Sequence, residues 1–158
     1  MAKLTWHGHS TFTFETADGT RILVDPWFEG NPKADRSLDQ VEAAQWIFCT
    51  HGHADHFKDA IPLARKMGAT LVSSFEIIQF AASMGLEKLQ ALGVGGGYDF
   101  PFGRVKMTAA LHGGHVHGDE SGMWSCTPGG FVFHLDGTRI YHAGDTALLG
   151  DMALLRGQ

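Results

Sequence analysis

The fold is decided by the stretch Thr50-His51-Gly52-His53-Ala54-Asp55-His56, which follows an apolar run typical of a buried strand, Trp46-Ile47-Phe48-Cys49. In extended backbone, residues two apart point to the same side. His51 and His53 can therefore offer imidazoles to one metal ion, while Asp55 and His56 are offset and can address a second. This spacing favours a metal site over an ordinary polar loop.

A helical pattern follows this stretch. Apolar residues recur at the spacing of one helix face from Ile61 to Met67, and Gly68 is typical of a helix C-cap. His56 should then lie at the start of a helix, where unpaired N–H groups disfavour an imidazolium. The ring would stay neutral, as a metal ligand must.

The rest of the chain predicts a layered α/β architecture. Asp18-Gly19 and Asp136-Gly137 are typical of tight turns between strands, and Ser37 with Gln40 predicts a capping box that opens a short helix. We expect strands over residues 4–6, 12–14, 22–24, 46–49, 70–72, 105–111, 131–135 and 139–142. We expect helices over residues 61–67 and 74–85, and the start of another that contains Leu148, Met152, Leu154 and Leu155.

The composition is that of one globular domain over residues 1–158, with 44% hydrophobic and 18% charged residues. A net charge of −5 without any run of Lys or Arg argues against a nucleic-acid partner. The sequence shows neither a signal peptide nor a membrane-spanning run, so no membrane partner is expected. Only two cysteines, Cys49 and Cys126, are present, which suits a reducing compartment. We expect a cytoplasmic protein.

The H-x-H-x-D-H stretch after a strand resembles the signature of the metallo-β-lactamase superfamily. Further blocks resemble, in the same order, a branch of metal-dependent hydrolases related to the ascorbate-phosphate lactonases. These blocks are Gly8-His9-Ser10, Val24-Asp25-Pro26-Trp27, Gly30-Asn31-Pro32, Ala110-Leu111-His112 and Tyr141-His142-Ala143-Gly144-Asp145-Thr146. The resemblance covers nearly the whole chain. It implies the α/β fold of that superfamily, an αββα sandwich, here without its last strand and helix.

The resemblance also implies two divalent metal ions held by His51, His53, Asp55, His56, His112 and Asp145. The first ion would have the three imidazoles of His51, His53 and His112. The second would have Asp55 and His56, with Asp145 bridging both ions. A bridging carboxylate makes physical sense because neutral imidazoles leave the charge of two close dications uncompensated. Zinc suits this ligand set best, and manganese, iron and nickel are alternatives.

Several other side chains have two open interpretations. His115 and His117 are rivals of His112, because all three lie in one glycine-rich segment. Asp25 either accepts an N–H from a ligand histidine or caps the turn before Pro26. His9 either lines the site or packs as a structural histidine. Strand alternation accounts for three more histidines, which we expect to be structural or exposed: His7, His134 and His142.

The resemblance implies a metal-dependent hydrolase, in which a hydroxide bridging two ions attacks a small ester, lactone or phosphate ester. Asp55 or Asp145 would act as the catalytic proton acceptor. The superfamily's final histidine ligand has no counterpart before Gln158, so the chain resembles a C-terminally truncated enzyme. The alternative is a non-catalytic metal-binding fragment. Its site would be completed by a second chain, a C-terminal segment or a second copy of itself.

Overall fold

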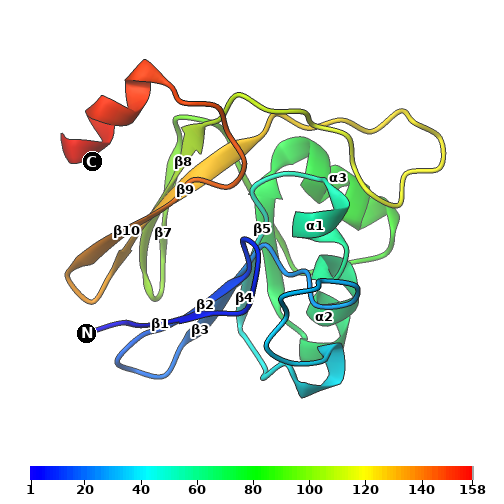
Figure 1. Ribbon diagram of the computed structural model, residues 1–158, viewed down its shortest axis with the longest axis horizontal. Helices are drawn as coiled ribbons and strands as arrows, with labels where there is room; N and C mark the ends of the chain where they lie inside the picture. The colour runs from blue at the N-terminus through cyan, green and yellow to red at the C-terminus, as the bar shows by residue number, and fades with distance from the viewer. Residues whose placement is uncertain (158) are drawn as a thin grey trace.

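A computed structural model describes residues 1–157, and in it two β-sheets pack face to face (Figure 1). Sheet A has six strands in the order β1-β2-β3-β4-β5-β6, and sheet B has four in the order β10-β9-β8-β7. The strands of sheet A are β1 (Lys3–Trp6), β2 (Phe12–Glu15), β3 (Arg21–Val24), β4 (Trp46–Phe48), β5 (Thr70–Ser74) and β6 (Leu89–Leu92). Those of sheet B are β7 (Gly97–Phe100), β8 (Gly103–Ala109), β9 (Gly129–Leu135) and β10 (Thr138–His142).

Helices cover the outer face of sheet A. They are α1 (Ala54–Phe57), α2 (Ala60–Met67) and α3 (Phe75–Ser83), and a short 3₁₀ helix, η1 (Leu38–Gln40), precedes β4. A second 3₁₀ helix, η2 (Gly150–Gly157), lies on the side of sheet B (Figure 1). No helix within residues 1–157 is long and apolar enough to cross a membrane.

Sheet A changes direction after β3. Strands β1 to β3 form an antiparallel meander, whereas β3 to β6 are parallel. Ile47 belongs to the core between sheet A and the helices, and its neighbour Phe48 belongs to the core between the two sheets. Because both faces of β4 are covered, the strand is a continuous apolar run rather than an alternating one.

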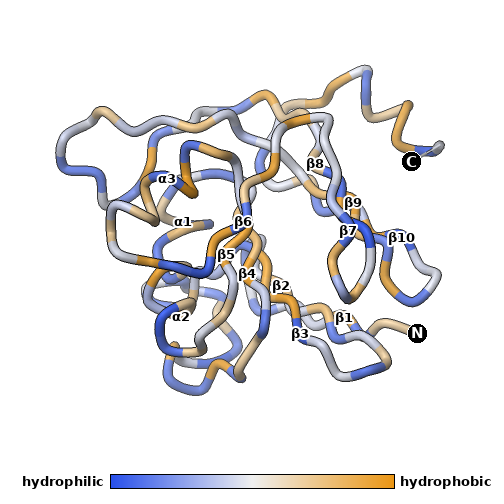
Figure 2. Tube along the Cα trace, turned by 180° about the vertical axis from the view of Figure 1, so that it is seen from behind, coloured by the Kyte–Doolittle hydropathy of each residue, from blue (hydrophilic) through white to orange (hydrophobic). Residues whose placement is uncertain are grey.

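Phenylalanine rings fill the space between the sheets. Phe48 meets Phe131 and Phe133 of β9 edge-on, with ring centroids 5.3 and 5.1 Å apart. It also meets Phe100 and Phe102 edge-on. Figure 2 shows the hydrophobic residues concentrated on the central strands of the two sheets. This core holds the ends of β4, β8 and β10 in fixed relation, and the loops that follow those strands carry the predicted ligands.

The expected α/β sandwich is confirmed, with differences in detail. Strands β6 and β7 were not expected, because Leu89–Leu92 lacks β-branched residues and Gly97–Phe100 begins with a glycine. The helix expected after Ser37 is a single 3₁₀ turn. Gln45 instead pairs with Arg21 through backbone and side chain, which aligns the chain for β4. The C-terminal helix start is also a 3₁₀ helix.

Candidate metal centre

The six predicted ligands lie together on loops from both sheets. His51 and His53 follow β4 of sheet A, and Asp55 and His56 lie in α1. From sheet B, His112 follows β8 and Asp145 follows β10. Their ligand atoms form overlapping groups of three, each with all atoms within 4.8 Å of one another; among these groups are His51, His53, His112 and His51, His56, Asp145.

The first group contains three imidazoles. His112 Nε2 lies 3.2 Å from His53 Nδ1, and the rings of His51 and His112 are 4.9 Å apart. An ion bound tetrahedrally by nitrogens at about 2.0–2.1 Å separates its ligand atoms by about 3.3–3.4 Å. The measured separation of His53 and His112 therefore matches two ligands of one ion.

The ligands predicted for the second ion, Asp55, His56 and Asp145, lie around His56 Nε2. His56 Nε2 is 4.0 Å from Asp55 Oδ2. Asp145 places Oδ1 3.3 Å from His56 Nε2 and Oδ2 3.8 Å from His112 Nε2. Its two oxygens thus point to the two groups, as a carboxylate that bridges two ions would.

Two buried nitrogens fit a metal. Within residues 1–157, His51 Nε2 and His56 Nε2 have no hydrogen-bond partner, although both side chains are fully buried. Leaving a buried polar atom unpaired costs about 1–3 kcal/mol. Each of these nitrogens lies in a group of candidate ligand atoms, so a bound cation would give its lone pair a partner.

Asp25 orients these two imidazoles. Its Oδ2 accepts a hydrogen bond from His56 Nδ1 at 2.8 Å and from the Thr50 hydroxyl at 2.8 Å. Because the Thr50 hydroxyl gives its proton to Asp25, its oxygen accepts from His51 Nδ1 at 3.0 Å. In both rings Nδ1 carries the proton, which leaves the Nε2 lone pairs free for a metal.

Comparisons with known proteins agree with this geometry. A family model described as "Beta-lactamase superfamily domain" matches residues 3–154. The chain belongs to this superfamily. It is 42% identical, over 97% of its length, to a UPF0173 metal-dependent hydrolase of Shouchella clausii, and 41% identical, over 98%, to one of Heliobacterium modesticaldum. It spans 67% and 64% of those two relatives, or about two thirds of their length.

Two solved structures share the fold. The structure of Igni18, a metallo hydrolase from Ignicoccus hospitalis, is 30% identical with a TM-score of 0.80; the match covers 97% of this chain and 64% of that one. An isothiocyanate hydrolase from Delia radicum gut bacteria is 22% identical with a TM-score of 0.70, covering 100% of this chain and 67% of that one. The second likeness is one of fold alone. The expected superfamily is thereby confirmed, and its metal-dependent hydrolase branch is the one these relatives represent.

The protonation states in this superfamily member follow from burial and neighbours. Burial, and then the nearby imidazole of His56, lower the pKa of His51 to about 4, so its ring is neutral near pH 7. Burial and His112 likewise lower the pKa of His53. Burial opposes protonation of His56, but the hydrogen bond and charge of Asp25 outweigh it and raise the pKa of His56. A proton on His56 Nε2 must leave before that atom can bind a metal.

The loops that carry the ligands are bound to one another. His117 N donates to Gly52 O at 2.7 Å, and Leu111 N donates to Thr146 Oγ1 at 2.9 Å. The second bond joins the segments that carry His112 and Asp145. Gly144, at φ +60°, is required because a Cβ there would lie 2.7 Å from Thr50 Cβ. The ligand positions thus depend on one another.

The remaining histidines take different places. His115 and His117 belong to none of the ligand groups within residues 1–157, and His115 pairs with Ser125 in an isolated β-bridge. His7 is structural, as expected, with Nδ1 3.0 Å from Asp35 and Nε2 2.8 Å from Thr13. His134 lies on β9 and is half-buried.

His142 has a structural role, one of the two that strand alternation left open. It is buried, and its Nε2 donates to Asp25 Oδ2 at 3.0 Å. It thus belongs to the network behind the centre. With His56 it outweighs the effect of burial and holds the pKa of Asp25 well below its usual range. Its position three residues before Asp145 was the one sequence signal that could have indicated this.

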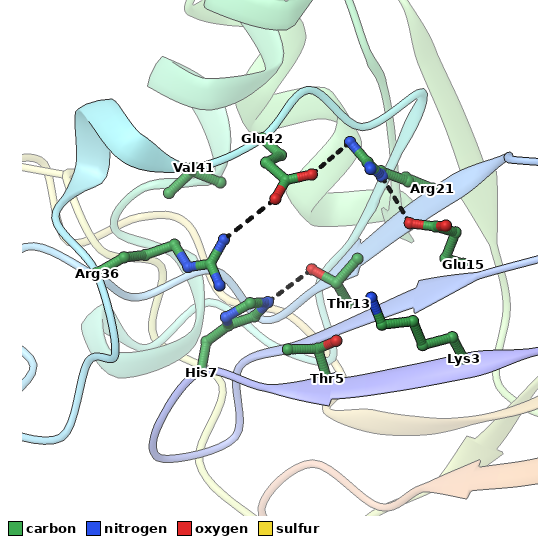
Figure 3. A pocket seen from close by; sticks show the side chains of 9 residues that line it. All are labelled: Lys3, Thr5, His7, Thr13, Glu15, Arg21, Arg36, Val41 and Glu42. Atoms are coloured by element: carbon green, nitrogen blue, oxygen red, sulfur yellow. Dashed lines mark hydrogen bonds and ion pairs between the residues drawn. The ribbon is translucent and has the colours of Figure 1, made fainter.

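A polar cavity of about 200 Å³ lies away from these ligands, on the outer side of β1 to β3 (Figure 3). Two of its three cations are paired: Arg21 contacts Glu15 and Glu42, and Arg36 also reaches Glu42. His7, which lines this cavity, is hydrogen-bonded through Nε2 to the Thr13 hydroxyl. The cavity contains none of the ligand groups, which lie in α1 and in the loops after β4, β8 and β10, and in the case of His9 in the β1–β2 turn.

Proposed function

We propose that this chain binds two divalent ions, with zinc as the first candidate, and uses them to hydrolyse a small ester, lactone or phosphate ester. The observation that carries the proposal is a pair of buried nitrogens, His51 Nε2 and His56 Nε2, which have no hydrogen-bond partner within residues 1–157 and lie in one ligand group with Asp145. Two structural histidines would have found hydrogen-bond partners, as His7 has. The names of the relatives support the same reaction class.

The chain's own residues have separable roles. His51, His53 and His112 would hold one ion, Asp55 and His56 the other, and Asp145 both. Bound ions of this kind lower the pKa of water toward 7 and so supply a nucleophile at neutral pH. Asp55 and Asp145 are about a third exposed, so their carboxylate oxygens can reach a substrate or its proton, whereas Asp25 is fully buried and only orients.

The substrate class is inferred from the surface around the centre. His112 and Asp145 are each about a third exposed, so these two predicted ligands open to solvent. An acidic chain without a basic run offers no track for a long polyanion. These features favour a small molecule that brings its carbonyl or phosphorus centre to the surface.

The test combines metal analysis with turnover. The chain, loaded with zinc or manganese, should bind close to two ions and hydrolyse p-nitrophenyl acetate, bis(p-nitrophenyl) phosphate or a simple lactone. His53→Ala should lose the first ion and activity, while His134→Ala, which removes a histidine of β9 outside the ligand groups, should keep both. Unchanged metal content in His53→Ala would contradict the ligand assignment.

A second candidate is metal binding without turnover until a further segment, another chain or a second copy completes the site. The chain spans only 64–67% of the length of these relatives, which supports a site that a further segment completes. It predicts one ion per chain, or none, and no hydrolysis of any of the three substrates. Activity that appears only when a C-terminal segment of a relative is added would support this candidate.

We also infer a cytoplasmic location. Both cysteines, Cys49 and Cys126, are free and buried in the structure. Unpaired cysteines suit a reducing compartment. Fractionation of the cells that produce the protein would test this inference directly, and recovery in a secreted fraction would contradict it.

A further inference from the structure

The turn between β1 and β2 brings an additional histidine to the centre. His9 lies in this turn with φ +52°, a left-handed conformation that is uncommon for a residue other than glycine. Gly8, at φ +102°, is required before it, because a Cβ there would collide with the backbone carbonyl of Lys33. Trp6 Nε1 donates to His9 O at 2.8 Å. The turn therefore fixes the backbone of His9.

His9 lies beside Asp55 and His56, the ligands predicted for the second ion. His9 Nε2 is 3.5 Å from Asp55 Oδ2, and its ring meets His56 edge-on at 5.0 Å. The ligand atoms of His9, Asp55 and His56 all lie within 4.8 Å of one another. On its other side, the ring packs edge-on against Trp27 at 5.2 Å.

The contacts of His9 differ from those of a structural histidine. His7, two residues earlier, uses both ring nitrogens in contacts of 3.0 and 2.8 Å. Within residues 1–157, the ring of His9 has one polar contact, the 3.5 Å approach of Nε2 to Asp55. That separation is long for a hydrogen bond, but it is close to the roughly 3.3–3.4 Å between two ligands of one tetrahedral ion.

We propose that His9 is a protein ligand of the second ion, bound through Nε2 beside Asp55 and His56. This inference rests on the two-ion centre proposed above. Asp55, His56 and one oxygen of Asp145 supply three ligands to that ion, and a zinc site commonly has four. The buried Nε2 of His56 has no hydrogen-bond partner in residues 1–157, although Asp145 and Asp55 approach it to 3.3 and 4.0 Å, and it marks the place that the four groups would share.

The test measures metal binding rather than activity. Co²⁺ is titrated into the metal-free chain, and bound ions are counted by elemental analysis and by the visible absorption of Co²⁺. The matched variant is His9→Asn, because asparagine tolerates the same left-handed backbone but lacks the imidazole. We expect the wild-type chain to bind two ions. In the variant, the dissociation constant of the second should rise about tenfold or more, since losing even an outer-shell partner costs that much.

Three further variants are controls. His115→Asn and His117→Asn remove histidines outside the ligand groups and should still bind two ions. Trp6→Phe keeps the imidazole but removes the bond that holds the turn, and should weaken the second ion less than His9→Asn does.

The outcomes separate the two proposals. If wild type binds two ions and His9→Asn binds both with unchanged affinity, the ligand role is wrong, even if turnover falls, because His9 then contacts substrate instead. The ligand role of His9 is also wrong if His115→Asn or His117→Asn loses the second ion while His9→Asn still binds both ions. A wild-type chain that binds only one ion overturns the two-ion centre as well.

Discussion

Asp25 shows how much one buried side chain can organise. It lies at the end of β3 with φ +46°, and its oxygens accept from Thr50 N, the Thr50 hydroxyl, His56 and His142 at 2.7, 2.8, 2.8 and 3.0 Å. One carboxylate thus sets the tautomers of His56 directly and of His51 through Thr50. The orientation of ligands in both groups depends on it.

Asp25→Asn should therefore weaken both stability and metal binding. An amide has one acceptor oxygen, so donors now bound to Asp25 would lose their partner, at about 1–3 kcal/mol for each buried group left unpaired. Metal affinity should fall about 10–100-fold, because the imidazoles lose their fixed orientation. Urea denaturation of the metal-free variant and metal titration measure the two effects.

Asp59→Asn is the matched control. Asp59 is also buried and accepts from the backbone of Phe28 and Glu29, but it belongs to no ligand group. It should lose stability and keep its metal affinity. Equal losses of metal affinity in both variants would show that Asp25 acts only through stability.

Asp145→Ala should affect the second ion more than the first. Three imidazoles remain for the first ion, whereas the second loses one of its few ligands. We expect reduced occupancy of the second ion and turnover lowered by far more than tenfold. Metal counting and kinetics on the same sample test this. Activity within about tenfold of wild type, or about 1.4 kcal/mol in barrier height, would show that the bridge is elsewhere.

At the scale of elements, the centre depends on the close approach of two loops. A Cβ on Gly52 would lie 2.8 Å from His115 O and 2.8 Å from Val116 Cα. Both are backbone atoms that cannot swing aside as a flexible side chain would. The glycine between His51 and His53 is therefore what lets the segment that carries His112 approach the loop after β4.

Gly52→Ala should push that segment outward. We expect a loss of about 1–3 kcal/mol in the free energy of unfolding, as for overpacking in general, together with weaker binding of the first ion. Denaturation and Co²⁺ titration give both values. Gly93→Ala is the control, because no atom lies within 4 Å of a Cβ there. First-ion affinity equal to wild type in Gly52→Ala would show that this contact does not position His112.

At the scale of the whole molecule, the predicted ligands come from both sheets. His51, His53 and His56 follow sheet A, whereas His112 and Asp145 follow sheet B. Bound ions would therefore join two layers that otherwise pack through the aromatic core around Phe48. Metal binding and folding should be coupled, since the unfolded chain holds no such arrangement.

Removal of metal should lower the thermal midpoint. An ion at one hundred times its dissociation constant stabilises the folded state by about 2.7 kcal/mol, which in a domain of this size corresponds to about 5–10 °C. Scanning calorimetry with zinc and with a chelator measures the shift. The double variant His51→Ala, His53→Ala should show no response to zinc. A wild-type midpoint that is unchanged by chelator would contradict the coupling.

Much of this protein could be predicted from the sequence, because the signals act over a few residues. The run before Thr50 predicts β4, Gly68 at φ +65° ends α2, and Asp136-Gly137 turns β9 into β10. The spacing of His51, His53, Asp55 and His56 indicates a metal site in the same local way. The elements that were missed, β6 and β7, have weak strand propensity of their own and form because neighbouring strands pair with them.

Only the tertiary structure decides which distant residues meet. His112 joins the ligand groups, while His115 and His117 in the same segment do not, because β8 ends at Ala109 and the bond from Leu111 to Thr146 positions the loop. The local sequence does not show that His9 and His142 approach the centre, although His9 lies in the Gly8-His9-Ser10 block and His142 lies three residues before Asp145. They reach the centre because the packing of two sheets brings strand ends more than one hundred residues apart to one edge, as the 117-residue separation of Asp25 and His142 illustrates.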